Sequence, residues 1–501
     1  MKEGGFHLLF SELIEGQTCL AAGGNQQVEI SGIAYDSRQV QPGFLFVAVE
    51  GFTTDGHRYV EQAISRGAVA VVVQKEIPLP SGIAYARVPD SRLALALLSA
   101  RFYDYPSRKL KVIGVTGTNG KTTTTHLVAA IYRAAGHKVG LIGTIANRIG
   151  DRVLPVVHTT PESLDLQKLL AEMVAEQVTV AVMEVSSHAL ALKRVAGCSF
   201  DAGVFTNITQ DHLDFHRDMD DYLAAKTILF RELGKDDKPA VAIINVDDSR
   251  AKKIVAATSV PVFTYGLSLK AQVKARDVKV TPRGASFTVI SPWGKRPVNL
   301  KLTGYFNVYN ALAAVTAAVA AGIPLSLAVE ALESVEGVPG RFELVDRGQD
   351  FTVVVDYAHT PDGLKNILTT ARAITPGRLI TVFGCGGDRD TSKRPLMGEI
   401  AARLSDLAVI TSDNPRTEDP GRIIAQVEEG VRRVRSDYRV VPDRREAIRF
   451  ALGVAAPGDT VIIAGKGHEN YQIIGTTRYP FDDRIEASKA LDEILNRGES
   501  L

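Results

Sequence analysis

Cysteine is scarce in this sequence, which has three cysteines among 501 residues. Cys19, Cys198 and Cys385 lie far apart, and none of them belongs to a CxxC pair. This spacing fits neither a disulfide framework nor a zinc site. Isolated cysteines are typical of a reducing compartment, so we expect a cytoplasmic protein.

Long apolar runs and a secretory leader are missing as well. The N-terminal run FHLLF is short, has Glu3 and Glu12 close to it, and lacks a basic region and a cleavage site. The most apolar long stretch, 310–332, is rich in alanine and interrupted by Gly322 and Pro324, which indicates a packed helix. We therefore predict neither export nor insertion into a membrane.

The sequence also has no excess of charge of one sign. Its 58 Lys and Arg residues are balanced by 57 Asp and Glu residues, which leaves a formal net charge of +1. A balanced protein has no overall field that would attract nucleic acid or an anionic membrane. We predict no nucleic-acid partner, and any anion-binding site must be local.

The length and the hydrophobic pattern indicate several domains of one class. At roughly 150 residues per domain, 501 residues correspond to about three domains. Short runs rich in Val and Ile alternate with stretches of helical spacing, which is typical of parallel sheets with crossover helices. We predict an α/β fold with three domains: a smaller α/β domain at 1–108, a doubly wound domain at 109–336 and a Rossmann-like domain at 337–501. Residues 260–302 alternate more finely and predict an antiparallel addition at a sheet edge.

A phosphate-binding loop follows the strand-like segment Lys111–Val115, where the sequence TGTNGKTTTT leads into a helical stretch. Glycines let backbone amides turn toward an anion, Lys121 brings a positive charge, and Thr122 offers a hydroxyl to a magnesium ion. The spelling is shorter than the general GxxxxGK[ST] pattern, and a glycine turn that merely precedes a helix is the structural alternative. The segment predicts a central ATP-binding domain whose loop residues are Gly117, Thr118, Asn119, Gly120, Lys121, Thr122 and Thr123.

Two further strands end in polar clusters. One ends in EVSSH, which contains Glu184, and another in TNITQDHLDFH, which contains His212. The carboxyl ends of strands in a doubly wound sheet lie at one edge, so both clusters should face Lys121. We predict that Glu184 and His212, with Thr122, hold magnesium directly or through water. Taken alone, either cluster would more often be a capped strand end.

Together, these motifs resemble those of the Mur ligases of peptidoglycan synthesis. Matching segments span the chain: YDSR, DGHRY, DYLAAK, YFNVYNALAA, GRFE, DYAHTP, GCGGDRD, DNPR and GKGHE. Within the family, the chain is most similar to members that add the third residue of the peptide. The resemblance implies that domain 1–108 holds the UDP end of the substrate, that domain 109–336 is an ATPase, and that domain 337–501 brings the amino acid.

The resemblance also implies the chemistry. ATP and Mg²⁺ would be the cofactors, and UDP-MurNAc-L-Ala-D-Glu and meso-diaminopimelate the substrates. ATP would phosphorylate the γ-carboxylate of D-glutamate, and the incoming amine would attack the acyl phosphate. The implied catalytic residues are Lys121, Glu184, His212 and Lys226. Lys226 would be carbamylated and would bind magnesium, although its position alone indicates a solvated helix lysine. We expect a monomer.

Further site residues carry over from the family position by position. Those for the nucleotide are Asn310, Arg341, Asp356 and His359. Those for the UDP substrate are Ser37, Thr53, Thr54, Thr159, Thr160, Ser186 and Arg194. The chain departs from the pattern at His158 and Leu192, where some members have an amide side chain, so those two contacts stay open.

The choice of amino acid depends on the segment DNPR. An arginine fork binds a carboxylate with two hydrogen bonds, and meso-diaminopimelate differs from lysine by one extra carboxylate. Arg416 should therefore favour diaminopimelate. The resemblance implies that Arg389 holds a carboxylate as well and that Gly465 and Glu469 receive the distal ammonium. The full predicted set is Arg389, Asp413, Asn414, Arg416, Gly465 and Glu469.

Three other functions are compatible with parts of the sequence. A lysine-adding ligase of the same family shares nearly all the motifs. A folylpolyglutamate synthetase has a similar phosphate loop, but it does not explain DNPR or YDSR. A regulatory ATP-binding switch would not need a third domain with Arg389, Arg416 and Glu469.

Overall fold

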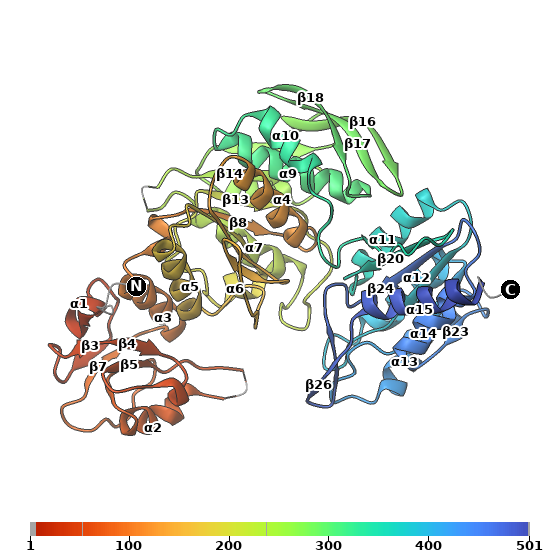
Figure 1. Cartoon of the computed structure of the whole chain (residues 1–501). Coiled ribbons are helices and arrows are strands. Elements are labelled where there is room, and N and C mark those ends of the chain that lie inside the picture. The colour runs from red at the N-terminus through yellow and green to blue at the C-terminus, as the bar shows by residue number, and fades with distance from the viewer. Residues whose placement is uncertain (1–6, 53, 237, 499–501) are drawn as a thin grey trace.

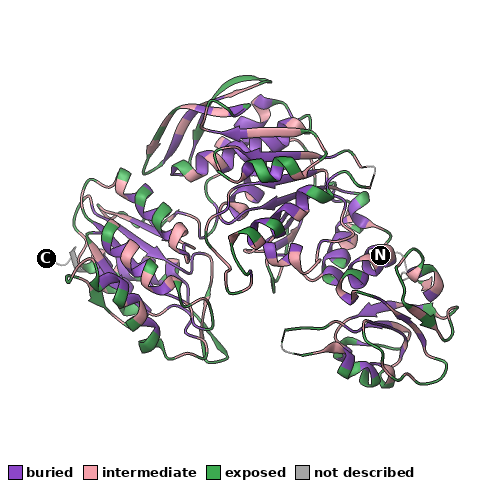
Figure 2. Cartoon of the chain, turned by 180° about the vertical axis from the view of Figure 1, so that it is seen from behind, coloured by how far each residue is buried: buried purple, intermediate pink, exposed green. Residues whose placement is uncertain are grey.

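The computed structural model describes residues 7–52, 54–236 and 238–498. Three lobes follow one another along the chain, each built on its own sheet (Figure 1). Buried residues lie along the strands and on the helix faces that cover them (Figure 2). The predicted α/β class with three domains is confirmed, whereas the boundaries at 108/109 and 336/337 stay predictions.

The N-terminal lobe has a five-stranded sheet in the order β2-β7-β6-β5-β4. Strand β2 pairs with β7 in the antiparallel sense, and the other pairs are parallel. A small two-stranded sheet, β1-β3, lies beside it. The strands are β1 (Leu8–Leu9), β2 (Ala21–Gly23), β3 (Glu29–Ile30), β4 (Gly32–Ala34), β5 (Phe44–Val47), β6 (Ala68–Val73) and β7 (Ala84–Arg87). The helices are α1 (Phe10–Ile14), α2 (Val60–Ser65) and α3 (Ser91–Phe102).

The central lobe has an eleven-stranded sheet in the order β11-β10-β9-β12-β8-β13-β14-β15-β16-β17-β18. Its strands are β8 (Lys111–Thr116), β9 (Val139–Ile142), β10 (Asn147–Ile149), β11 (Arg152–Leu154), β12 (Val180–Glu184), β13 (Ala202–Phe205), β14 (Val241–Asn245), β15 (Val262–Gly266), β16 (Val273–Thr281), β17 (Gly284–Ser291) and β18 (Gly294–Leu300). Its helices are α4 (Lys121–Ala134), α5 (Ser163–Ala175), α6 (Ser187–Ala191), α7 (Met219–Glu232), α8 (Ala251–Ala257), α9 (Tyr305–Ala320) and α10 (Leu325–Glu333).

The middle of this sheet sets the position of the site. Strands β9, β12, β8, β13, β14 and β15 pair in parallel, so their carboxyl ends lie at one edge. These strands are nearly continuous apolar runs because helices cover both faces of the sheet. Separate apolar clusters fill the two faces, one including α4, α9 and α10 and the other α5 and α7. Strands β16, β17 and β18 pair antiparallel at one end of the sheet, as the sequence predicts.

The C-terminal lobe has a six-stranded sheet in the order β19-β20-β24-β21-β22-β23, with β19 antiparallel to β20 and the other pairs parallel. Its strands, with the separate hairpin β25-β26, are β19 (Glu343–Leu344), β20 (Thr352–Asp356), β21 (Leu379–Phe383), β22 (Leu407–Ile410), β23 (Arg439–Val440), β24 (Thr460–Ala464), β25 (Tyr471–Ile474) and β26 (Thr477–Pro480). Its helices are α11 (Pro361–Ile374), α12 (Lys393–Leu404), α13 (Pro420–Arg432), α14 (Arg444–Gly453) and α15 (Asp483–Gly498).

A buried ion pair joins two helices of the C-terminal lobe. Arg444 begins α14 and Asp483 begins α15, and both side chains are fully buried. The guanidinium donates to the two carboxylate oxygens at 2.7 Å each, and Nη2 also donates to the carbonyl of Ala464 at 3.0 Å. Such a pair holds the helix ends together because either charge alone would be buried without compensation.

Within the described part of the chain, no helix is both long and apolar enough to cross a membrane.

The ion pair yields a stability prediction. Asp483→Asn should lower the free energy of unfolding of the C-terminal lobe by about 3–5 kcal/mol, because the buried Arg444 guanidinium loses its two-bond carboxylate partner and keeps only the more distant Asp413, at 3.9 Å. The double variant Arg444→Met/Asp483→Leu should regain most of this loss. Urea denaturation followed by circular dichroism measures both.

The exposed pair between Arg347 and Asp492 provides the control, since both side chains are more than two-fifths exposed. Asp492→Asn should change stability by no more than about 1 kcal/mol. An Asp483→Asn protein as stable as this control would contradict the structural role of the buried pair.

Candidate active site

A cavity of about 1130 Å³ is lined by residues from all three lobes, with Phe52 contributed by the N-terminal lobe. Most of the site residues predicted from the sequence line it. They are Thr118, Asn119, Gly120, Lys121, Thr122, Thr123, Thr159, Thr160, Glu184, Ser186, Arg194, His212, Lys226, Asn310, Arg341, Asp356, His359, Arg389, Asp413, Asn414, Arg416, Gly465 and Glu469.

Three described residues of the predicted set are not part of this lining. Ser37 is buried in the N-terminal lobe, where its hydroxyl donates to Gln62 Oε1 at 2.8 Å. Thr54 is exposed, and its hydroxyl donates to the Tyr59 hydroxyl at 3.2 Å. Thr53 lies outside the described residues. Gly117 takes part through its carbonyl oxygen, which receives bonds from two lysines.

The phosphate loop connects β8 to α4, and its shape requires two glycines. Gly117 has φ +151°, and a Cβ there would lie 1.8 Å from Thr206 Oγ1. Gly120 has φ +86°, and a Cβ there would lie 2.4 Å from Asn310 Oδ1. No side chain fits at either position, so the backbone of the loop stays open toward the cavity.

Two lysines converge on this loop. Lys121 Nζ donates to the carbonyl of Gly117 at 2.9 Å and to that of Thr118 at 2.7 Å, and Lys226 Nζ, from α7, donates to Gly117 at 2.9 Å. Lys226 is 1% exposed, and burial, followed by the charge of Lys121, holds its pKa well below the usual range. The position of Lys226 therefore differs from that of a solvated helix lysine, and burial favours the neutral form of its amine.

The predicted magnesium ligands face the same cavity. Glu184, at the end of β12, accepts from the Thr144 amide at 2.8 Å and from its hydroxyl at 3.0 Å. Burial lowers the pKa of His212 to about 3, so its imidazole is neutral. The Thr122 hydroxyl accepts a hydrogen bond from Arg341 Nη2 at 3.0 Å.

These donors fit magnesium as part of a coordination shell. The Glu184 carboxylate and the Thr122 hydroxyl are the hard oxygen donors that the ion prefers. Among the described residues, no group of three or more His, Cys, Asp or Glu side chains is arranged to hold a metal by itself. Magnesium usually keeps several waters and takes phosphate oxygens as ligands, so a partial protein shell suits a nucleotide-bound ion.

The predicted nucleotide residues come from α9, from the segment after α10 and from the end of β20. Asn310 Nδ2 donates to Asn307 Oδ1 at 3.0 Å, and the Arg341 guanidinium lies 4.5 Å from the centre of the Tyr357 ring. Asp356 accepts from the amide of Phe342 at 2.7 Å, and burial raises the pKa of its carboxyl. The arrangement brings the C-terminal lobe against the phosphate loop.

Asp362 was not predicted from the sequence, yet it joins the two lobes directly. Its Oδ2, on α11, accepts from Asn119 Nδ2 at 2.7 Å and from the Thr209 hydroxyl at 3.0 Å. The DYAHTP motif ends one residue before it, so adjacency to that motif is the one available signal. Asp362 links the phosphate loop to the C-terminal lobe.

A second group of predicted residues lines the cavity beside Glu184. The Thr160 hydroxyl donates to the Glu184 carbonyl at 2.9 Å, and Arg194 Nη1 donates to the Thr160 carbonyl at 3.2 Å. Arg194 Nε also lies 3.3 Å from Glu162 Oε2. His158 and Leu192, the two departures from the family pattern, line the cavity as well.

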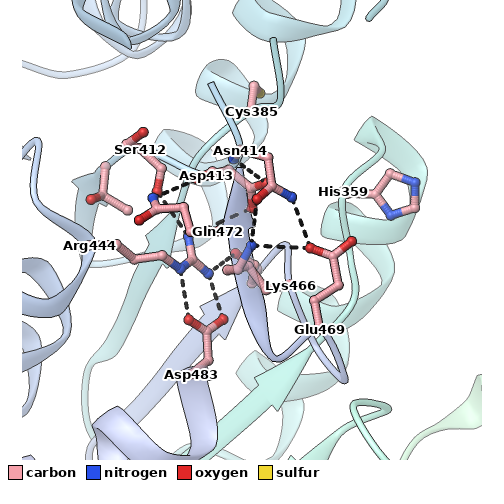
Figure 3. Close-up of polar contacts among 12 residues, drawn as sticks. His359, Cys385, Ser412, Asp413, Asn414, Arg444, Lys466, Glu469, Gln472 and Asp483 are labelled. Carbon is pink, nitrogen blue, oxygen red and sulfur yellow. Dashed lines mark hydrogen bonds and ion pairs between the residues drawn. The ribbon is translucent and has the colours of Figure 1, made fainter. Parts of the chain in front are cut away.

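The third group lies at the carboxyl edge of the C-terminal sheet (Figure 3). Asn414 Nδ2 donates to Glu469 Oε2 at 2.9 Å, and Lys466 Nζ donates to Asn414 Oδ1 at 2.9 Å. Asp413 is buried, and its Oδ2 has no hydrogen-bond partner in the described part of the chain. This oxygen is buried, lies 3.9 Å from Arg444 Nη1, and would be 2.7 Å from a Cβ at Gly465. A carboxylate oxygen that accepts no hydrogen bond is suited to accept one from a cationic ligand group.

Two arginines in this region have no carboxylate partner among residues 7–52, 54–236 and 238–498. Arg416 Nη1 donates to the Gly387 carbonyl at 2.7 Å, and Arg389 Nη1 donates to the Asp388 carbonyl at 2.9 Å. Burial, and then Arg389, lower the pKa of Arg416, which reflects the cost of two cations close together. The region therefore offers cationic forks beside the Asp413 carboxylate. The sequence analysis missed Lys466, although it is part of GKGHE.

The cavity thus combines a phosphate loop, hard oxygen donors and a pocket with charges of both signs. Three protein-family models match the chain in succession: "Mur ligase family, catalytic domain" at residues 29–103, "Mur ligase middle domain" at 115–318 and "Mur ligase, glutamate ligase domain" at 340–467.

Individual proteins match over nearly the full length. A UDP-N-acetylmuramoyl-L-alanyl-D-glutamate–2,6-diaminopimelate ligase from Geobacillus thermodenitrificans is 51% identical, with 94% of this chain and 96% of that protein covered. A ligase of the same name from Syntrophomonas wolfei is 51% identical, with 96% and 98% covered. A solved structure of a ligase with the same name is 35% identical and has a TM-score of 0.70, with 97% of this chain and 99% of that chain covered. With family models in all three lobes and close relatives along its whole length, the chain belongs to the Mur ligase family.

Proposed function

We propose that this protein is an ATP- and magnesium-dependent ligase that joins meso-2,6-diaminopimelate to the D-glutamate γ-carboxylate of UDP-MurNAc-L-Ala-D-Glu. The reaction supplies a peptidoglycan precursor. The observation that carries the proposal is the position of Arg416, whose guanidinium lines the cavity without a carboxylate partner among the described residues. Relatives named for 2,6-diaminopimelate support the same choice over lysine.

The amino-acid pocket complements a molecule with two zwitterionic ends. Meso-diaminopimelate carries two carboxylates and two amines, and the pocket offers two arginine forks in Arg389 and Arg416. Asp413 and Glu469 line the same cavity, and their carboxylates would receive an ammonium group. A lysine ligand would leave one arginine without a carboxylate, which costs the desolvation energy of a charged donor.

The phosphate loop would carry the first half of the reaction. In phosphoryl transfer the protein mainly positions the reactants and neutralises charge. Lys121 donates to the loop carbonyls, and Arg341 donates to the hydroxyl of Thr122 in the first turn of α4. Both cations would therefore face the triphosphate. A bound magnesium ion, held by Thr122 and Glu184, would supply further positive charge at the phosphates.

Once modified, Lys226 would complete the set of oxygen donors around the magnesium ion. A neutral amine reacts with carbon dioxide to give a carbamate and releases a proton, and burial, which lowers the pKa of Lys226, favours the neutral amine. The carbamate is anionic and bidentate, which would relieve the repulsion between Lys226 and Lys121 and provide oxygen donors for a cation.

The substrates indicate where the protein works, and the cavity indicates how many chains it needs. ATP and the UDP-linked precursor are cytoplasmic metabolites, so the reaction would take place in the cytoplasm. All three lobes that line the cavity belong to one chain, which supports a monomer as the working unit.

The specificity assignment predicts the behaviour of an Arg416 variant. Arg416→Ala should raise the KM for meso-diaminopimelate by about 10- to 150-fold, which corresponds to the loss of one hydrogen bond to a charged group. The low rate of ADP release with lysine should stay unchanged. ADP release in the presence of UDP-MurNAc-L-Ala-D-Glu and each amino acid measures this. Arg422→Ala, an exposed arginine on α13, should behave like the parent protein. A parent protein that prefers lysine would refute the proposed substrate.

The carbamate assignment predicts chemical rescue. Lys226→Ala should reduce ADP release on the order of 100-fold or more, because a preorganised charged group is lost. Formate or acetate should restore part of the activity by supplying a carboxylate in the vacated space. Lys252→Ala, an exposed lysine on α8, is the matched control. Full activity of Lys226→Ala without an added carboxylate would exclude the role.

A further inference from the structure

Lys466 is a buried lysine to which the chemistry above gives no role. It lies two residues after the end of β24, and its side chain is fully buried. The glycines on either side have positive φ, +123° at Gly465 and +52° at Gly467. A Cβ at Gly467 would lie 2.7 Å from the Cβ of Tyr357, so this tight turn requires a glycine. The turn directs the ammonium group of Lys466 into the interior of the C-terminal lobe.

Lys466 donates to two side chains of the amino-acid pocket (Figure 3). Its Nζ lies 2.9 Å from Asn414 Oδ1 and 3.1 Å from Glu469 Oε2. Asn414 Nδ2 donates to the same Glu469 oxygen at 2.9 Å, so the three side chains form a closed network. The cavity, as described, is lined by Asn414 and Glu469 but not by Lys466. Lys466 therefore contacts two residues that a ligand can reach, while it lies behind them itself.

The network fixes the orientation of the Asn414 amide. Two donors meet at its Oδ1, the Lys466 ammonium and the backbone amide of Ile473, which lies at 2.9 Å. An amide oxygen accepts hydrogen bonds and an amide nitrogen donates two of them. Within the described chain, Glu469 takes one hydrogen of the nitrogen. The second hydrogen is available to a carboxylate of the ligand.

The network also distinguishes the two oxygens of Glu469. Its Oε2 accepts from both Lys466 and Asn414. Its Oε1 has one contact among the described residues, the hydroxyl of Tyr471 at 3.5 Å. Oε1 is therefore the oxygen that an ammonium group of the ligand would contact.

The charge of Lys466 acts on a second carboxylate of the pocket. Burial opposes ionisation of the Asp413 carboxyl, but the positive charges of Lys466 and Arg444 hold its pKa below the usual range. Arg444 is already bound to both oxygens of Asp483. Lys466 thus favours the ionised form of Asp413 and contacts Glu469 directly, the two carboxylates expected to bind an ammonium group.

We infer that Lys466 is a positioning residue for the amino-acid substrate, because it holds Asn414 and Glu469 in the geometry that binds one zwitterionic end of the ligand. The inference rests on the proposed function and deepens it, since it adds a residue that controls amino-acid affinity without touching the substrate. The acceptors of Lys466 both belong to the C-terminal lobe, so the phosphate loop should not feel its loss.

The test compares Lys466→Met with Lys466→Gln. Lys466→Met removes the charge and the donors, and it should raise the KM for meso-diaminopimelate about tenfold or more. The KM values for ATP and for UDP-MurNAc-L-Ala-D-Glu, and kcat at saturating amino acid, should stay within about threefold of the parent values. Lys466→Gln keeps a neutral donor and should give a smaller rise. Lys489→Met, an exposed lysine beside Glu486 on α15, is the matched control and should behave like the parent protein.

A double-variant cycle with Glu469→Gln separates positioning from a purely structural role. Residues in one hydrogen-bond network are coupled. The KM for diaminopimelate in Lys466→Met/Glu469→Gln should therefore rise at least about threefold less than the product of the two single effects. Thermal unfolding shows that each variant is folded, and Lys466→Gln replaces Lys466→Met in the cycle if the latter does not fold.

Three outcomes would overturn the inference: single effects that multiply fully, equal rises in the KM of all three substrates, or an unchanged KM for diaminopimelate with less folded protein. A parent protein that releases no ADP with diaminopimelate contradicts the proposed function instead.

Discussion

The side-chain amines of Lys121 and Lys226 share one backbone oxygen at the centre of this protein, the carbonyl of Gly117. Lys121 and Lys226 each donate to it at 2.9 Å. Neutral carbonyl oxygens cannot compensate two positive charges in a poorly solvated site, and burial together with the charge of Lys121 lowers the pKa of Lys226. The carboxylates of Glu184 and Asp211 line the same cavity as Lys121, and an anionic ligand is favoured at the loop.

The backbone of the loop is fixed as firmly as its charge. The Thr206 side chain occupies the space that a side chain at residue 117 would need, and Asn310 does the same at residue 120. The Asn207 side chain accepts from the Asn119 amide at 2.9 Å. Because neighbouring strands and helices hold the loop from several sides, its amides and lysines are set in place before any ligand arrives, which is how an enzyme site limits reorganisation during the reaction.

The sequence predicts those features that arise from local patterns. The strand, loop and helix around Lys121 can be predicted because consecutive residues encode them. The convergence of Glu184 and His212 on Lys121 can be predicted because parallel strands end at one edge of the sheet. The bond between Asn119 and Asp362 joins residues 243 positions apart, and no local pattern encodes it. The burial of Lys226 likewise results from the packing of α7 against the loop, so only the family resemblance indicated its role. The bond of Ser37 to Gln62 depends on how α2 packs in the N-terminal lobe, which the resemblance does not describe.

The residues proposed for the two chemical tasks of the cavity lie on separate hydrophobic cores. Arg389, Arg416 and Glu469 project from the six-stranded lobe, whose apolar clusters are its own apart from Phe306, whereas Lys121 and Lys226 belong to the eleven-stranded lobe. Substitutions that change which amino acid is chosen therefore leave the packing beneath the phosphate loop intact. Selectivity can diverge among descendants of one ancestral ligase while bond-forming chemistry is inherited unchanged.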